Sequence, residues 1–174
     1  YQLSPNSAKL RQNQTVKETE ARGGAVYGMT DEEYKKILSD TMLPITAVCA
    51  DYDQLSKDVQ PFNDNAIKFG LNSHLLLINH PDGPISLEKT KEATELFNRA
   101  GAELQKEGIS LLYHPHGYEF VKDQKIVPMN YMLKNAKNFA FNMDVFWVKM
   151  GGADPLKIMK TYPGKFPMLH LKTD

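Results

Sequence analysis

Short apolar runs alternate along this chain with segments in which apolar residues recur at helical spacing. Runs of strand length, bounded by Gly, Pro or polar residues, predict strands at 45–50, 74–80, 109–114, 139–148 and 166–171. Spacings of three and four predict helices at 30–40, 63–69, 86–106, 130–136 and 154–161. Residues 1–24 are polar and poorly patterned, which predicts a loop with a short strand near 16–21.

Capping residues support several of these helix boundaries. Thr30 and Glu33 have the spacing of a capping box, which predicts a helix start at residue 31. Ser86 is placed to cap the long amphipathic helix, and Gly108 to end it. Asp154-Pro155 has the form of an N-cap followed by proline in the first turn of a helix.

Nearly continuous apolar strands that alternate with helices are typical of a parallel sheet covered by helices, so we predict an α/β fold. The length of 174 residues predicts one domain over 1–174. In such folds ligands bind at the carboxyl ends of the strands. Five candidate residues lie at or near those ends: His80, His114, His116, Asp144 and His170.

Composition narrows the classes of partner. Lys+Arg and Asp+Glu number 21 each, and this balance disfavours a nucleic-acid-binding surface. No apolar run approaches the roughly 20 residues of a membrane span. We therefore expect a soluble protein with no membrane partner; a cytoplasmic location is favoured, and the start at Tyr1 leaves export open. The single Cys49, in an apolar run, predicts a buried thiol.

The segment Tyr113 to Phe120 carries the most informative chemistry. His114 and His116 share a face if the strand continues through them, and Glu119 follows three residues later. Imidazole and carboxylate groups at a strand end suggest a divalent metal site or a proton-transfer site. Pro115 and Gly117 also fit the alternative of two surface histidines on a turn.

Two later strands add candidate ligands. Asp144 interrupts an apolar run, and a buried carboxylate there needs a partner or a metal. His170 stands between Leu169 and Leu171 and is either a ligand or a hydrogen-bonded core histidine.

Four ordered motifs resemble the sugar phosphate isomerase/epimerase family, whose fold is the xylose isomerase-like TIM barrel. They are Tyr113-His114-Pro115-His116-Gly117-Tyr118-Glu119-Phe120, Asp144-Val145-Phe146-Trp147, Gly152-Ala153-Asp154-Pro155 and Phe166-Pro167-Met168-Leu169-His170-Leu171-Lys172. The resemblance covers roughly residue 26 to the C-terminus. It implies a (β/α) barrel that binds Mn²⁺, Mg²⁺, Co²⁺ or Zn²⁺, with Mn²⁺ favoured.

The resemblance also assigns roles. Asp144 matches the family's metal-binding aspartate and His170 its histidine, whereas His114 stands where a glutamate is usual. His116 and Glu119 are then candidates for the catalytic base. Substrate contacts fall to His80, Trp147 and Lys172, although His80 also fits a turn and Trp147 a core position.

The chain is short for the fold it resembles. A (β/α)₈ barrel takes about 250 residues, whereas this sequence supplies five convincing strands and a sixth candidate near residue 18. We therefore expect a partial barrel without the family's second glutamate ligand. Unpaired strand edges would favour pairing, so a homo-oligomer is an open expectation.

These features together predict a metal-dependent isomerase or epimerase of a small sugar or keto-sugar, acting through an enediolate. A dehydratase of the keto-inositol type uses the same first proton transfer. A non-catalytic sugar-binding remnant is the alternative that the altered ligand set supports. An endonuclease acting on damaged DNA shares the barrel, but the balanced charge and the three arginines disfavour it.

Overall fold

The computed structural model describes residues 29–42, 47–50, 52–62, 64, 75–78, 80, 83–123 and 125–172. The chain divides into two compact units, residues 1–45 and 46–174. The prediction of one domain over 1–174 stays a prediction. No described helix is both long and apolar enough to cross a membrane.

In the first unit the described residues form one helix, α2 (Asp31–Thr41). The predicted capping box is present: Glu33 N donates to Thr30 Oγ1 at 3.2 Å, and Thr30 N donates to Glu33 Oε2 at 2.8 Å. Met42 ends the helix in the left-handed conformation. The predicted strand near 16–21 lies outside the described residues.

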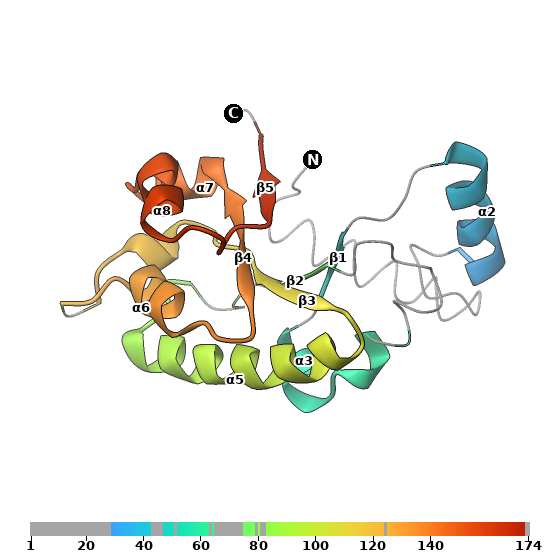
Figure 1. The fold of residues 1–174 in the computed structure, drawn as a ribbon, viewed down its shortest axis with the longest axis horizontal. Helices are drawn as coiled ribbons and strands as arrows, with labels where there is room; N and C mark the ends of the chain where they lie inside the picture. The colour runs from blue at the N-terminus through green and yellow to red at the C-terminus, as the bar shows by residue number, and fades with distance from the viewer. Residues whose placement is uncertain are drawn as a thin grey trace. The chain divides into compact units, whose positions relative to one another are not determined.

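The second unit contains a five-stranded, all-parallel sheet with the strands in sequence order (Figure 1). The strands are β1 (Ala47–Cys49), β2 (Leu75–Ile78), β3 (Ser110–Tyr113), β4 (Ala140–Asp144) and β5 (Met168–His170). A doubly wound sheet reverses its strand order at a switch point, whereas a barrel adds each strand beside the last. The predicted α/β fold is confirmed, and the order is that of a barrel.

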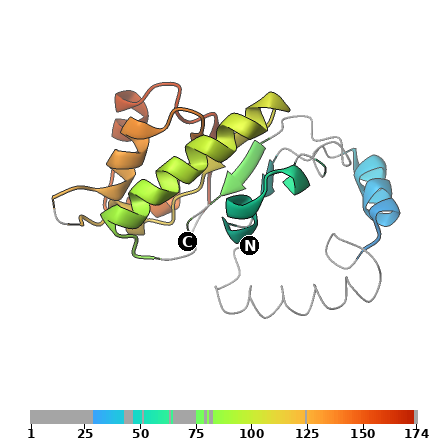
Figure 2. The ribbon, with the colours of Figure 1, turned by 90° about the horizontal axis from the view of Figure 1, so that it is seen from below.

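Helices connect and cover these strands. They are α3 (Tyr52–Lys57), α5 (Leu87–Lys106), the 3₁₀ turn η1 (Tyr118–Phe120), α6 (Pro128–Asn135), α7 (Val145–Met150) and α8 (Pro155–Thr161). Figure 2 shows the long α5 running alongside the sheet, and α5 contacts β3, α3 and α6. Its buried residues, which include Ala93, Phe97, Ala100 and Leu104, recur at spacings of three and four.

Aromatic rings join α5 to the sheet. Phe97 is fully buried, and its ring centroid lies 5.6 Å from those of both Tyr113 on β3 and Phe139 before β4. Phe139 in turn lies 5.3 Å from Phe141. Each buried aromatic side chain of this kind removes roughly 150–250 Å² from water, so this cluster holds β3 and β4 in place.

Two predictions of local structure were wrong. The strand expected over 139–148 ends at Asp144, because the Asp144 side chain caps α7 and turns the chain into a helix. Cys49 is exposed rather than buried, since β1 is an outer strand of the sheet. The helix predicted over 63–69 lies mostly outside the described residues.

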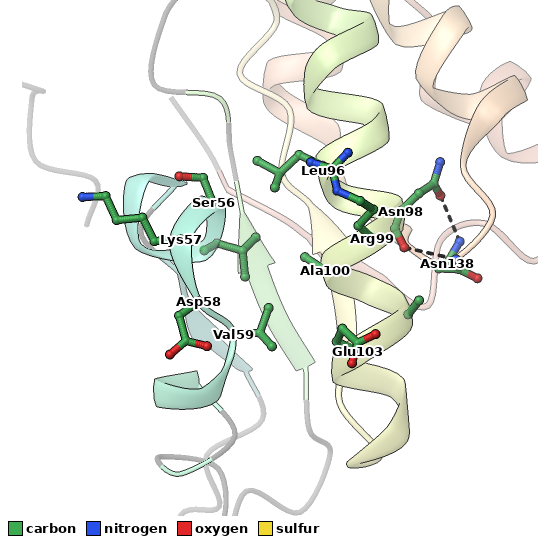
Figure 3. Close-up of a pocket in the computed structure, with 12 residues that line it drawn as sticks. Ser56, Lys57, Asp58, Val59, Leu96, Asn98, Arg99, Ala100, Glu103 and Asn138 are labelled. Carbon is green, nitrogen blue, oxygen red and sulfur yellow. Dashed lines mark hydrogen bonds between the residues drawn. The ribbon is translucent and has the colours of Figure 1, made fainter.

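A hollow of about 610 Å³ lies between α3 and α5 (Figure 3). Ser56, Lys57 and Val59 line one side, and Arg99 and Glu103 line the other. None of the candidate site residues takes part in it. It lies among the covering helices, whereas ligands of barrel folds bind at the carboxyl ends of the strands.

Candidate metal centre

Strand register brings the predicted ligands together. Asp144 is the register partner of His170 across β4 and β5. Tyr113 is the partner of Phe141 across β3 and β4, so the next residue, His114, lies beside Asn142. Because all these strands are parallel, the three candidate ligands reach the same edge of the sheet.

His114, Asp144 and His170 form a cluster in which one ligand atom from each lies within 4.8 Å of the others. Asp144 Oδ2 is 3.2 Å from His114 Nε2 and 3.2 Å from His170 Nδ1. Two ligands bound tetrahedrally at about 2.1 Å from Zn²⁺ lie about 3.4 Å apart, so this spacing fits a divalent ion. Of the described residues, Asp144 supplies the cluster's one carboxylate.

The two carboxylate oxygens of Asp144 make different contacts. Oδ1 accepts a hydrogen bond from Trp147 N at 2.9 Å and caps α7. Oδ2 faces the two histidines and the Lys172 ammonium, whose Nζ is 3.7 Å away. Asp144 is fully buried, while the His170 side chain is 38% exposed. The cluster is therefore anchored from within and open on the His170 side.

The environment keeps the imidazoles of the Tyr113–Phe120 segment neutral. Burial lowers the pKa of His114 below its ordinary value, and the nearby Asp144 carboxylate partly opposes this. Burial, helped by the neighbouring His114, lowers the pKa of His116 to about 4. A metal binds only a neutral imidazole, and near pH 7 these rings meet that requirement.

His116, Trp147 and Lys172 lie next to the cluster and contact one another. The His116 ring stacks on His114 at 5.0 Å between centroids and meets Trp147 edge-on at 5.9 Å. Lys172 Nζ lies 4.4 Å from the centroid of Trp147 and 4.6 Å from that of Phe146. The Trp147 ring and the Lys172 ammonium beside this cluster suit a ligand that has both hydroxyl groups and an apolar face.

Glu119, a predicted candidate for the catalytic base, is fully buried. It lies on η1 and accepts hydrogen bonds from Tyr113 Oη at 2.7 Å and from His116 N at 3.0 Å. Burial raises the pKa of this carboxyl group, and the hydrogen bonds it accepts partly oppose the rise. Its role as a base stays a prediction; its contacts are those of a group that positions the turn carrying His116.

His80 is buried beside Tyr52 and Tyr118. Its ring lies 5.0 Å from that of Tyr52, and its carbonyl accepts a hydrogen bond from Tyr118 Oη at 2.9 Å. A substrate contact by His80 therefore stays a prediction.

Sequence reasoning missed Asn142. Its Nδ2 lies 3.3 Å from His114 Nδ1, on the side of the ring opposite the cluster. Asn142 stands two residues before Asp144 on the same strand, so the period of two places both side chains on one face of the sheet. That periodicity was the signal that could have identified it.

Comparison with known proteins places this fold. No family model matches the sequence, and a search of curated proteins finds no match. Among solved structures, a sugar phosphate isomerase/epimerase from Parabacteroides distasonis matches with a TM-score of 0.70 and 23% identity over 86% of this chain. A second one from that organism matches with a TM-score of 0.66 and 25% identity over 83% of the chain.

The 3-keto-D-glucoside 4-epimerase from E. coli matches with a TM-score of 0.58 and 15% identity over 82% of this chain. The chain spans 64%, 57% and 64% of the lengths of these three proteins, in the order given. Further matches include an AP endonuclease from Brucella melitensis and a probable dehydratase from Bacillus anthracis. The predicted resemblance is confirmed: the chain has the fold of part of a xylose isomerase-like TIM barrel.

Proposed function

We propose that this chain carries the divalent-metal site of a sugar or keto-sugar isomerase or epimerase. The observation that carries the proposal is the His114–Asp144–His170 cluster at the carboxyl edge of a barrel-type sheet. The likeness in fold to two sugar phosphate isomerases/epimerases and a keto-glucoside epimerase supports the substrate class. Two imidazoles and one carboxylate suit Mn²⁺, Co²⁺ or Zn²⁺.

A bound ion would polarise a substrate carbonyl and its neighbouring hydroxyl, which acidifies the adjacent C–H bond. His116 then accepts that proton on a ring that burial keeps neutral. The Lys172 ammonium stabilises negative charge on the resulting enediolate, and Trp147 packs against the apolar face of the sugar. Return of the proton to another carbon isomerises the substrate, and return to the opposite face epimerises it.

Two variants of Asp144 test the metal site. Asp144→Asn keeps an oxygen that can cap α7 but removes the charge, whereas Asp144→Ala removes both. We expect near-stoichiometric Mn²⁺ or Zn²⁺ on the wild type by elemental analysis and titration, and at least a hundredfold weaker binding in both variants. Equal loss in the two variants would separate ligation from capping. Unchanged binding in Asp144→Asn would refute the site.

Turnover is tested by following the proton rather than the product. Sugars and keto-sugars are incubated with metal-loaded protein in D₂O, and exchange of the carbon-bound hydrogen is followed by NMR. Deuterium uptake in the wild type that is lost in His116→Gln would support His116 as the base. Exchange that survives in His116→Gln and disappears in Glu119→Gln would transfer that role to Glu119.

Non-catalytic sugar binding is the second candidate. It is favoured by the single carboxylate of the cluster in the described residues, because His114 occupies the place where the resemblance implies a glutamate. Sugar binding without deuterium uptake, and with equal affinity in the presence of EDTA, would establish this candidate in place of the first.

A further inference from the structure

Two hydrogen bonds of His114 agree on one tautomer. Nε2 faces the Asp144 carboxylate at 3.2 Å, and a carboxylate only accepts, so Nε2 carries the proton. Nδ1 faces Asn142 Nδ2 at 3.3 Å, and an amide NH₂ only donates, so Nδ1 has the lone pair. The two contacts are made on opposite sides of the ring and give the same result.

This tautomer does not fit metal ligation. In His114 the nitrogen that faces Asp144 is Nε2, and a nitrogen that carries a proton has no lone pair for an ion. Ligation through Nε2 requires the proton to be on Nδ1 instead. Nδ1–H then needs an acceptor, and a donor NH₂ placed 3.3 Å away would oppose it.

Asn142 can supply that acceptor. It is fully buried, and its Oδ1 makes no hydrogen bond with any described residue. Rotation of the amide by about 180° exchanges Oδ1 and Nδ2 with little change of shape. After this rotation Oδ1 accepts from His114 Nδ1–H.

We propose that Asn142 is a positioning residue that follows the tautomer of His114, donating to Nδ1 in the metal-free site and accepting from Nδ1–H in the loaded site. His114 stays neutral, because the proton lost from Nε2 is balanced by the one gained on Nδ1. Hydrogen bonds of this kind behind a metal-binding histidine fix its tautomer and contribute about 10- to 100-fold in metal affinity. The inference rests on the proposed metal site.

The direct test is the position of the proton, measured on the wild-type protein. Zn²⁺ suits NMR because it is diamagnetic. The ring ¹⁵N signals of His114 are assigned among the five histidines by their loss in His114→Gln. We expect the proton on Nε2 without metal and on Nδ1 with Zn²⁺. A proton that stays on Nε2 in the zinc-loaded protein would overturn the proposal.

Variants supply the second test. Asn142→Leu keeps the branched shape of the side chain but neither donates nor accepts, so Zn²⁺ binding should weaken 10- to 100-fold in titration calorimetry. Asn142→Asp presents only acceptor oxygens, favours the tautomer needed for ligation, and should bind at least as tightly as the wild type. Met143→Ala, a buried neighbour on the opposite face of β4, controls for loss of stability.

The outcomes separate this inference from the function on which it rests. A wild type that takes up no metal would refute both together. A wild type that binds Zn²⁺, with an Asn142→Leu variant of equal affinity, would refute only the role of Asn142 and leave the metal site standing.

Discussion

At the scale of single residues, the lysine that matters most is Lys172, which forms an ion pair with Asp144 Oδ2. Its Nζ is 3.7 Å from Oδ2, and its side chain is only 21% exposed. A divalent ion bound at Oδ2 would repel this ammonium, so metal binding must overcome the existing ion pair. Lys172 therefore both neutralises Asp144 without metal and opposes the metal when it arrives.

We expect Lys172→Met to bind Mn²⁺ or Zn²⁺ about three- to tenfold more tightly than the wild type, which corresponds to the roughly 1 kcal/mol of a partly exposed ion pair. Trp147 is the chain's single tryptophan, and its ring contacts Lys172, so its fluorescence reports the titration. Lys149→Met removes an exposed charge outside the cluster and serves as control. Weaker binding in Lys172→Met would contradict the competition.

At the scale of elements, the turn after β3 packs against the end of α7 through two glycines. A Cβ on Gly151 would lie 2.5 Å from Gly117 O and 2.8 Å from Phe120 Cδ2, so only glycine permits this approach. Gly117 has φ of +94° and immediately follows His116. The position of His116 over the cluster therefore depends on a contact between two backbones.

Gly151→Ala should push this turn away from α7. We expect a loss of about 1–3 kcal/mol in the free energy of unfolding, from overpacking, and weaker metal binding as the turn shifts. Gly152→Ala is the matched control: nothing lies within 4 Å of its Cβ, and only the strain of φ at +79° remains. Urea unfolding and metal titration measure both effects. Equal metal affinity in the two alanine variants would show that the turn does not depend on the contact.

The sequence predicted the elements well where hydrophobic period and caps agree, as in α2, α5 and α8. The prediction failed at the end of β4, because the apolar run Phe146, Trp147 and Val148 fits a helix as well as a strand. The capping hydrogen bond from Trp147 N to Asp144 decides between helix and strand, and it cannot be inferred from the hydrophobic pattern. The candidate ligands His114, Asp144 and His170 were predicted because they lie at or directly after the ends of strands. The burial of Glu119 and the contact between Asn142 and His114 depend on tertiary structure.

At the scale of the second unit, the histidines of the candidate site also make the stability of the fold depend on pH. The lowered pKa values of His114 and His116 mean that the folded protein binds fewer protons than the unfolded chain in the range below the ordinary histidine value of 6.5. Stability therefore rises with pH across that range and falls as the solution is acidified. For His116 the window extends from 6.5 down to about 4. Glu119 acts in the opposite sense. Its raised pKa means that, on acidification, the folded state binds this proton at a higher pH than the unfolded chain, which favours the folded state.

Urea unfolding of the wild type and His116→Gln at pH 7, 5.5 and 4.5 separates these contributions. Glutamine does not titrate, so the variant should lose less stability than the wild type between pH 7 and 4.5, while the contribution of Glu119 is common to both. The difference should grow steadily from pH 6.5 to 4.5, because His116 becomes largely protonated in the folded state only below about pH 4. Parallel curves would mean that His116 has an ordinary pKa in the folded protein. The ring would then be largely solvated rather than packed between His114 and Trp147, and it would lack the neutral, partly buried state that the proposed proton transfer requires.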